Sequence, residues 1–372
     1  MATQSVAVEE VGQLARTGQD IGRISQWTLM RRRFMENKLS VVGGIILIVM
    51  YLMAGFAPFL SPYPYDELDS NSIWSAPTAI YMVNGRPSVC SVSQSLDTNT
   101  FTFVSHLDCT KAYPVKLFVH GYSYTLFGII PSDVHLFGVD APAKLFLFGT
   151  DGQGRDMLSR LLEGSRISLS VGLVGVALAI IFGSVLGTVS GYLGGATDNL
   201  IQRFIELIMS MPTIPLWAAF AAALPQDMSV VKRYFFITLI LSLVQWTGLA
   251  RQVRGKVMAY RTLDYTLAAK LAGASDMRII LTHMLPNAVS HIIVVAALAV
   301  PSTILGETAL SFLGLGMLPP AVSWGVLLRD AQQVQVVEQH AWLLIPAVAV
   351  IIAVTCYQFL GDGLRDAADP YS

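Results

Sequence analysis

The sequence of 372 residues is 53% hydrophobic and only 13% charged, with a formal net charge of -1 and a mean hydropathy of +0.57. This composition excludes an ordinary soluble globular domain, and the near-zero charge offers no basic field for nucleic acid. Several apolar stretches could cross about 30 Å of hydrocarbon as helices, and none alternates like the strands of a membrane barrel. We therefore expect an all-α integral membrane protein.

The amino-terminal segment, residues 1–40, is polar and lacks the layout of a cleavable signal peptide. The first apolar stretch, 41–61, is therefore expected to act as a signal anchor. About six spans are predicted in total, and five or seven remain possible. The other five predicted spans are 167–190, 201–224, 234–252, 288–309 and 341–361.

Basic residues gather before the first predicted span and after the fourth. The first group is Arg16, Arg23, Arg31, Arg32, Arg33 and Lys38, and the second is Arg251, Arg254, Lys256, Arg261, Lys270 and Arg278. Because cytoplasmic loops carry an excess of Lys and Arg, both groups are expected in the cytoplasm. An even number of spans then places both termini there, including the tail 362–372.

The segment 62–166 is predicted to lie outside and to contain a β-rich insert. In one predicted hairpin, strand 80–83 leads into a turn at 84–85. In another, the turn at 120–121 joins strands 115–119 and 122–127. Cys90 and Cys109 both lie in this segment, where an oxidising compartment would permit a disulfide worth about 3 kcal/mol. Free buried thiols are the alternative.

A helix-turn-helix is predicted between the fourth and fifth spans. Asp264 can cap a helix on which Leu263, Leu267 and Leu271 recur every four residues. Gly273 would end that helix in a left-handed conformation. Either Ser275 or Asp276 would cap the next helix, and Pro286 suits the first turn of the fifth span.

These two helices are too short to be stable alone in water. Leu267, Ala268 and Leu271 therefore need a surface to pack against. That surface could belong to the protein's own body or to a soluble partner, and the residues alone leave both possibilities open.

The same stretch resembles the cytoplasmic loop of ABC importer permeases. Its pattern is Ala268-Ala269, three residues, Gly273, nine residues, and then His283-Met284-Leu285-Pro286. In that family the loop, here 255–287, is the coupling helix that docks on the ATPase subunit. Leu267 stands where the family has Glu and His283 where it has Ile, so a polar contact made by that Glu cannot be carried over. The docking residues implied by the resemblance are Asp264, Tyr265, Leu267, Ala268, Ala269, Leu271, Gly273, Ala274, Asp276, His283 and Pro286.

Three further segments resemble the dipeptide/oligopeptide branch, in particular the second of its two paired permease subunits. They are 149–160 (GTDGQGRDMLSR), 307–325 with its ETALSFLGLG, PP and SWG elements, and 360–370 (LGDGLRDAADP). The resemblance covers about 31–65 and 147–372. The segment between these regions is longer than the branch leads us to expect.

The resemblance implies a type I importer permease fold that forms half of a translocation path for peptides or similar small solutes. The implied partners are a homologous second permease in a heterodimer, two ABC ATPase subunits, a periplasmic solute-binding protein and the lipid of a bacterial inner membrane. ATP and magnesium would bind the ATPases, and no cofactor is expected in this chain. The only Gly-Lys pair, Gly255-Lys256, is followed by Val257, so the chain lacks a phosphate-binding loop and is not expected to be an enzyme. The six histidines show no zinc spacing and no catalytic arrangement.

Two features bear on the transport mechanism. Glu307 is expected either to line an outer gate or contact a binding protein, or to fasten the turn at 311–313 by a hydrogen bond. Pro212, Pro215 and Pro301 are expected to kink their helices. An ion-coupled secondary carrier is the alternative function, but it would need ionisable residues deep in the spans, and these are scarce.

Overall fold

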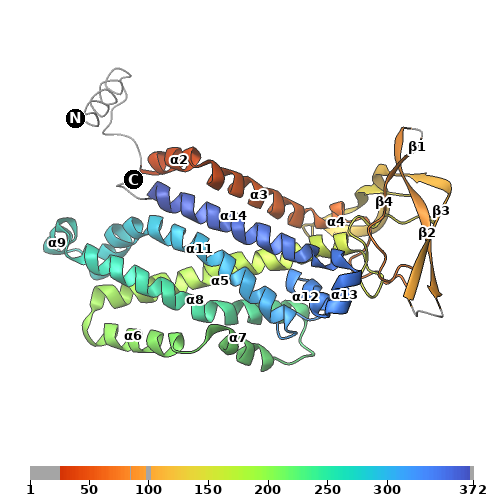
Figure 1. Cartoon of the computed structure of the whole chain (residues 1–372). Coiled ribbons are helices and arrows are strands. Elements are labelled where there is room, and N and C mark those ends of the chain that lie inside the picture. Colours follow the sequence, from red (N-terminus) through yellow and green to blue (C-terminus); the bar gives the residue numbers. More distant parts are fainter. Residues whose placement is uncertain (1–25, 84, 98–101, 369–372) are drawn as a thin grey trace, which may run out of the picture.

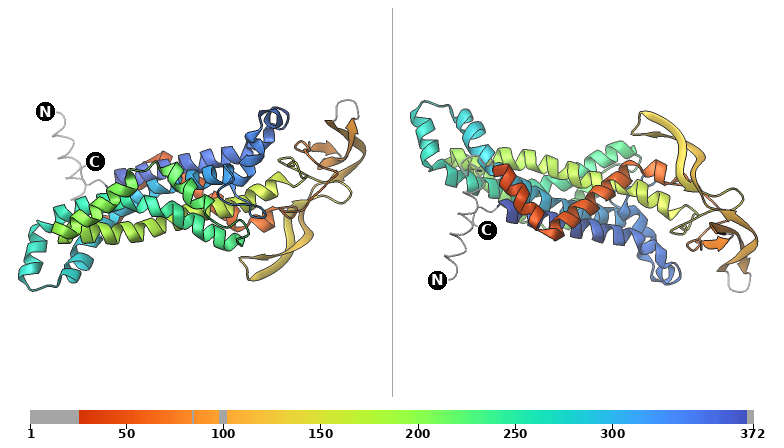
Figure 2. Two further views of the ribbon diagram at one scale, coloured as in Figure 1. Left: turned by 90° about the horizontal axis from the view of Figure 1, so that it is seen from below. Right: turned by 90° about the horizontal axis from the view of Figure 1, so that it is seen from above.

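The computed structural model describes residues 26–83, 85–97 and 102–368, and it consists of a helical body with a β-rich insert at one end (Figure 1). The views from below and above show the same elongated arrangement (Figure 2). The start of α2 (Gln26–Glu36) and the end of α14 (Ile345–Ala368) lie at the end opposite the insert, the same end as α9 (Asp264–Leu271). The two ends of the described chain therefore lie on the same side as the loop between the fourth and fifth predicted spans.

Five helical segments in the described part of the chain are long and apolar enough to cross a membrane. They are α3 (Lys38–Gly55), α5 (Met157–Leu193), α8 (Val230–Arg261), the segment Asp276–Phe312 and a last one that ends with α14. A sixth span exists if α6 (Gly195–Met209) and α7 (Thr213–Ala222) are counted as one broken helix. The expectation of about six transmembrane helices is confirmed on that count.

The third predicted span, 201–224, is not one straight helix. α6 and α7 are bent by 83° at a break that contains Pro212, the N-cap residue of α7. Proline has no amide hydrogen and disfavours the helical conformation in the preceding residue, so the break occurs where the sequence predicted a kink. By contrast, α11 (Leu285–Phe312) continues through Pro301.

The second span begins well before the predicted residue 167. Its first residue is Met157, because the Asp156 carboxylate caps the helix by accepting a hydrogen bond from the Ser159 amide at 2.8 Å. The first turns of α5 carry polar residues, so the hydropathy of the sequence did not mark them as helix. α8 likewise continues past residue 252 to Arg261. Its last turns are polar, so the hydropathy of the sequence did not mark them as part of the span.

The β-rich insert contains two sheets (Figure 1). Strands β1 (Tyr81–Val83), β2 (Arg86–Asp97) and β3 (Thr102–Pro114) form an antiparallel sheet in that order, and β4 (Lys116–Leu126) pairs with β5 (Ile130–Gly138). The hairpin predicted at 84–85 is confirmed by the pairing of Val83 with Arg86. Cys90 and Cys109 form a disulfide between β2 and β3.

The second hairpin was predicted with the wrong turn. β4 runs straight through 120–121, and the chain reverses at 127–129, where Phe127 and Gly128 adopt positive φ angles of 52° and 70°. Gly121 instead lies at a register irregularity in β4, and the His135 ring packs so closely over it that a Cβ would lie 2.7 Å from that ring. A glycine inside a strand therefore marks a close approach here and not a turn.

Short helices complete the end of the molecule that carries the insert. They are α4 (Ala57–Leu60), α12 (Trp324–Leu328), the 3-10 turn Arg329–Gln332, α13 (Val334–Gln339) and the 3-10 turn Ala341–Leu344. At the opposite end, α10 (Asp276–Ile279) passes through a π-helical turn, Ile280–Met284, into α11.

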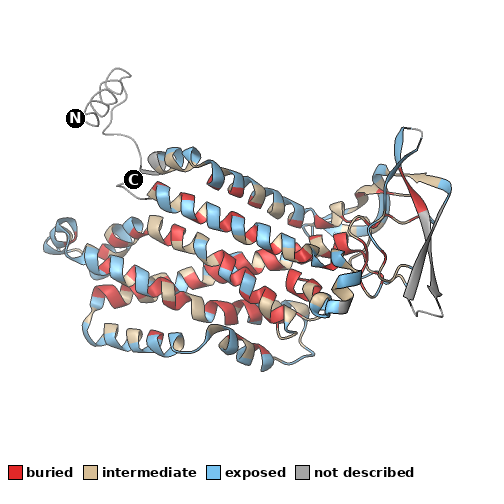
Figure 3. Ribbon diagram, viewed as in Figure 1, coloured by how far each residue is buried: buried red, intermediate tan, exposed pale blue. Residues whose placement is uncertain are grey.

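The buried core follows the axis of α5 and α11 (Figure 3). α5 and α8 approach closely at two glycines, because a Cβ on Gly187 would lie 2.5 Å from the Ala250 carbonyl oxygen and one on Gly191 would lie 2.7 Å from that of Arg254. Small residues at four-residue spacing allow membrane helices to pack backbone to backbone. The end of α5 is thereby fixed beside the end of α8, from which the candidate coupling loop extends.

Candidate coupling loop and outer cluster

The candidate coupling loop begins where α8 ends and α9 starts. The N-cap residue of α9 is Leu263, and no side chain caps the helix, so the prediction that Asp264 is the cap was wrong. Asp264 is instead the first helical residue and is exposed. Thr266 anchors this turn, because its side chain is buried and its hydroxyl donates a hydrogen bond to the Tyr260 carbonyl at 2.8 Å.

The predicted bend at Gly273 is confirmed. Its φ angle is +81°, and the Ala274 and Gly273 amides donate to the carbonyls of Ala269 and Lys270 at 3.0 and 3.1 Å. This pair of hydrogen bonds satisfies the last carbonyls of α9 in the manner of a Schellman motif. Of the two caps left open by the sequence, Ser275 caps α10, since its hydroxyl accepts the Arg278 amide at 3.4 Å.

Asp276 has a different partner. Its carboxylate accepts a hydrogen bond from the Tyr192 hydroxyl, at the end of α5, with an oxygen–oxygen distance of 2.5 Å. A hydrogen bond to an ionised group is stronger than a neutral one. The loop is thus tied to α5 as well as to the two helices that it connects.

The inner side of the loop packs on the protein's own body. Ile279 and Met284 are fully buried in a cluster that also contains Val253, Val257 and Ala288. Ala269 and Ala274 pack against the same cluster and are partly buried. Small side chains at these two positions allow the loop to lie close to α8 and α11.

The loop also carries four apolar side chains that are exposed, among exposed charged residues such as Lys270 and Arg278. We call these four residues the outer loop face: Leu267, Leu271, Met277 and Leu281, which are 47%, 90%, 64% and 55% exposed. Ala268 is exposed as well. The protein's own body therefore covers none of the three residues, Leu267, Ala268 and Leu271, that the sequence expected to need a packing partner. Figure 1 places α9 at the tip of the molecule, farthest from the insert.

The remaining predicted loop residues lie beside this face. The rings of Tyr265 and His283 are 6.4 Å apart between centroids, and the Asn287 side-chain amide donates to the His283 carbonyl at 2.6 Å. Pro286 is in the first turn of α11, as predicted, and is exposed. The structure therefore gathers all eleven predicted positions into one loop.

Glu307 lies in the last turns of α11 and is fully buried. Its carboxylate accepts hydrogen bonds from the hydroxyls of Ser311 and Ser168 at 2.7 and 3.1 Å. The Ser311 hydroxyl also accepts the Met317 amide at 2.9 Å, and Ser168 accepts the Trp324 amide at 3.0 Å. A residue with no exposed surface cannot contact a binding protein in this conformation, so the geometry supports the alternative in which Glu307 fastens the turn.

The segment at 149–160 is organised around the buried carboxylate of Asp151. Its oxygens accept the amides of Gln153 and Arg155 at 2.8 and 3.1 Å, and they pair with the side chains of Arg155 and Arg160 at 2.7 and 3.2 Å. Gly154, at φ +75°, packs so tightly on the Asp69 carbonyl that no Cβ would fit. The sequence analysis did not predict this ion-pair cluster. The signal in the sequence was an Asp followed by Arg residues four and nine positions later.

Comparisons with known proteins identify the family. Residues 155–370 match the family described as the binding-protein-dependent transport system inner membrane component. The chain belongs to this family. Residues 25–77 match the N-terminal transmembrane domain of oligopeptide transport permease C.

Similar curated proteins carry matching names. The oligopeptide transport system permease protein OppC of Haemophilus influenzae is 33% identical, over 98% of this chain and 94% of its own. OppC of Bacillus subtilis is 30% identical, over 93% and 90%. A chain of the MetNI methionine ABC transporter, in an inward-facing conformation, covers 57% of this chain and 97% of its own at 18% identity and a TM-score of 0.45.

Membership in this family makes the chain a multi-pass permease subunit of an ABC importer, and the comparisons give no support to a secondary carrier. Permeases of this kind transport solute and work with separate ATPase subunits, so the chain is not an enzyme. Among the described residues, no group of three or more His, Cys, Asp or Glu side chains could hold a metal ion.

Proposed function

We propose that this chain forms half of a translocation path for peptides or similar small solutes. Its relatives in Haemophilus influenzae and Bacillus subtilis are named as oligopeptide transport permeases, which supports a peptide as the solute. A homologous second permease would complete the path, and a periplasmic solute-binding protein would deliver the solute. Two ATPase subunits would bind ATP and magnesium and supply the energy.

The observation that carries the proposal is the outer loop face. Four exposed apolar side chains stand on a loop whose inner side is packed and whose bend is fixed by Gly273. Several exposed apolar side chains grouped on one loop are typical of a protein interaction site. We place the ATPase on this face and assign Asp264, Tyr265, Leu267, Ala268, Leu271, Met277 and Leu281 to its surroundings.

In this mechanism, ATP draws the two ATPases together, and each ATPase moves the coupling loop docked on it. The loop transmits this motion to α5 through the Tyr192–Asp276 hydrogen bond and to α8 and α11 through the chain itself. Rigid-body rocking of the two permeases then switches the path between inward- and outward-facing states. The loop and both ends of the chain would lie in the cytoplasm, and the β-rich insert would lie in the periplasm, where it would contact the binding protein or the second permease.

Co-purification of the ATPase tests the docking assignment. The variant Leu271→Asp adds a charge to a side chain that is 90% exposed, so the fold should tolerate it. The control is Val334→Asp, since Val334 is also apolar and 71% exposed but lies in α13 at the outer end. Native protein and the control should retain the ATPase, and Leu271→Asp should lose it. Retention by all three would reject this face as the docking site.

A further inference from the structure

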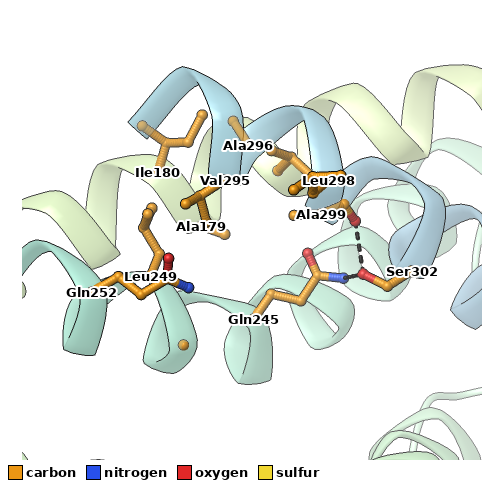
Figure 4. A pocket seen from close by; sticks show the side chains of 12 residues that line it. Ala179, Ile180, Gln245, Leu249, Gln252, Val295, Ala296, Leu298, Ala299 and Ser302 are labelled. Atoms are coloured by element: carbon orange, nitrogen blue, oxygen red, sulfur yellow. Dashed lines mark hydrogen bonds between the residues drawn. The ribbon is translucent and has the colours of Figure 1, made fainter. Parts of the chain in front are cut away.

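A cavity of about 320 Å³ lies between α5, α8 and α11, three of the helices that are long and apolar enough to cross a membrane. Its lining is largely apolar, with Ala179 of α5 and Val295 and Ala299 of α11 among the residues. Three polar side chains face it, Gln245 and Gln252 of α8 and Ser302 of α11 (Figure 4). The twelve described residues that line the cavity include no ionisable side chain.

The polar groups are only partly satisfied within the chain. The Gln245 side-chain amide donates to the Ser302 hydroxyl at 3.3 Å, and its carbonyl oxygen accepts from Thr303 at 2.9 Å. Ser302 donates to the Ala299 carbonyl at 2.7 Å. A primary amide has two donor hydrogens, so Gln245 keeps one for another partner. Gln252 is exposed and has no hydrogen-bond partner among the described residues.

Such a face is unsuited to lipid. An unsatisfied polar group costs several kcal/mol in hydrocarbon, where no water is available. α3 shows the contrast, because its exposed residues Ile45, Ile48, Val49 and Leu52 are all apolar, as contact with lipid requires. The face of α8 that carries Gln245, within the predicted span 234–252, therefore turns toward something polar, and Gln252 follows on the same face at the end of that span.

The same face also leaves space for an occupant. Gln245, Gly248, Gln252 and Gly255 recur at intervals of three and four residues, which places them on one side of α8. A Cβ at either glycine would meet no atom within 4 Å. Close packing against another helix of this chain therefore does not explain these glycines, unlike Gly187 and Gly191 of α5.

We propose that this cavity is a solute-contact site of the translocation path and that it recognises uncharged main-chain amide groups of a passing peptide. The inference rests on the proposed function, because the solute must reach the path through an assembled importer. A glutamine side chain offers one acceptor and two donors, which matches the donor and acceptor of a peptide unit. With no charge in the lining, the site tolerates peptides whose side chains differ in charge, and the moderate size of the cavity suits a short segment.

The test measures uptake by the importer reconstituted with its second permease, ATPases and binding protein. The probes are radiolabelled Ala-Ala-Ala, Ala-Asp-Ala and Ala-Lys-Ala, which share their termini and main chain. Gly248→Trp fills the cavity, and Ile48→Trp on α3 is the matched control, since Ile48 is 61% exposed on an apolar face. Gln252→Glu and Gln252→Lys place opposite charges in the same cavity.

Gly248→Trp should lower the uptake of all three peptides about tenfold relative to the control, while the ATPase remains bound. Gln252→Glu should lower the uptake of Ala-Asp-Ala about tenfold relative to Ala-Lys-Ala, and Gln252→Lys should reverse that order, because like charges a few Å apart repel at a low dielectric constant. A merely structural role of Gln252 would not reverse the order of the peptides. Native uptake by Gly248→Trp, or equal effects of the two charged variants on all peptides, would overturn the proposal. Failure of the proposed function is distinct, because the native complex itself would then retain no ATPase or take up no peptide.

Discussion

Tyr192 and Asp276, 84 positions apart in the sequence, are joined by a hydrogen bond of 2.5 Å between the tyrosine hydroxyl and the aspartate carboxylate. Tyr192 is at the end of α5, and Asp276 begins the second helix of the candidate coupling loop. The bond fixes the loop to a helix that it does not directly follow. The loop therefore contacts a third membrane-spanning helix, and we propose that motion of the loop reaches α5 through this contact.

The variant Tyr192→Phe should uncouple the loop from α5. It removes the hydroxyl and keeps the ring, so we expect a loss of about 2 kcal/mol in the stability of the loop, as for a hydrogen bond to a charged group. Amide hydrogen exchange across 264–279 should speed up, and solute-stimulated ATP hydrolysis by the assembled importer should fall, while the ATPase stays bound. Unchanged exchange and unchanged stimulation would show that this bond transmits nothing.

Asp156 should make the stability of the protein depend on pH. Its pKa is raised to about 6, because burial, together with nearby Asp151, raises the pKa more than the hydrogen bonds from Ser159 lower it. Because the pKa in the folded state is above the unfolded value, the stabilising contribution is present below about pH 4 and is lost as the pH rises through 6. The loss is on the order of 3 kcal/mol.

Asp156→Asn preserves an oxygen that can cap α5 and removes the titration. Thermal unfolding in detergent from pH 4 to pH 8 should therefore show a steeper fall in Tm with rising pH for the native protein than for the variant. Asp330, whose pKa is raised by burial and by Asp151, titrates in the same direction in both proteins. Parallel profiles would contradict the assignment to Asp156.

Removal of the disulfide should weaken the insert and spare the helical body. Cys90 and Cys109 are 19 positions apart, and a closed loop of that length stabilises a fold by about 3 kcal/mol in the chain-entropy account. A Cys90→Ala, Cys109→Ala double variant should be cleaved faster by protease within 81–138, with helical circular dichroism unchanged. Cys356→Ala, at the remaining cysteine, is the control. Alkylation of both cysteines in unfolded, unreduced protein would exclude the bridge.

Substitution of Glu307 should lower the stability of the protein without changing the binding of the ATPase. Glu307→Ala leaves the hydroxyls of Ser168 and Ser311 without their buried acceptor, at a cost of about 1–3 kcal/mol in stability. Glu307→Gln preserves an acceptor and should lose less. A Tm that is lower than native for Glu307→Gln and lower still for Glu307→Ala, with native ATPase binding in both, would support the role of Glu307 in fastening the turn at 311–313. A Glu307→Gln variant that is as stable as the native protein but takes up no solute would instead support the alternative in which Glu307 lines an outer gate.

The sequence predicted those features that arise from local chemistry. Apolar stretches marked the membrane helices, Pro212 marked a break, and Gly273 marked the bend of the loop, because in each case the residue itself imposes the conformation. The prediction failed where a distant contact decides. Gly121 was taken for a turn residue, but the His135 ring lies over it.

The site was predicted to a similar extent. The leucines of α9 were identified from their spacing, yet only the structure shows that Leu267 and Leu271 face outward while Ala269 faces the body. The partner of Glu307 at Ser311 is one helical turn away and could be predicted, whereas Ser168 lies 139 positions away and could not. Gln245 and Gln252 were missed, although two glutamines seven positions apart in an apolar stretch were a readable signal.

Photocrosslinking from the outer loop face tests the central claim most directly. A photoreactive amino acid at position 271 or at position 334 would be activated in the importer assembled with its ATPases, binding protein and second permease. Both positions are exposed and apolar in the native protein, but their helices, α9 and α13, lie at opposite ends of the molecule. We expect an adduct with the ATPase from position 271 and none from position 334. An ATPase adduct from position 334 alone, or from neither position in a complex that still hydrolyses ATP, would contradict docking on the coupling loop.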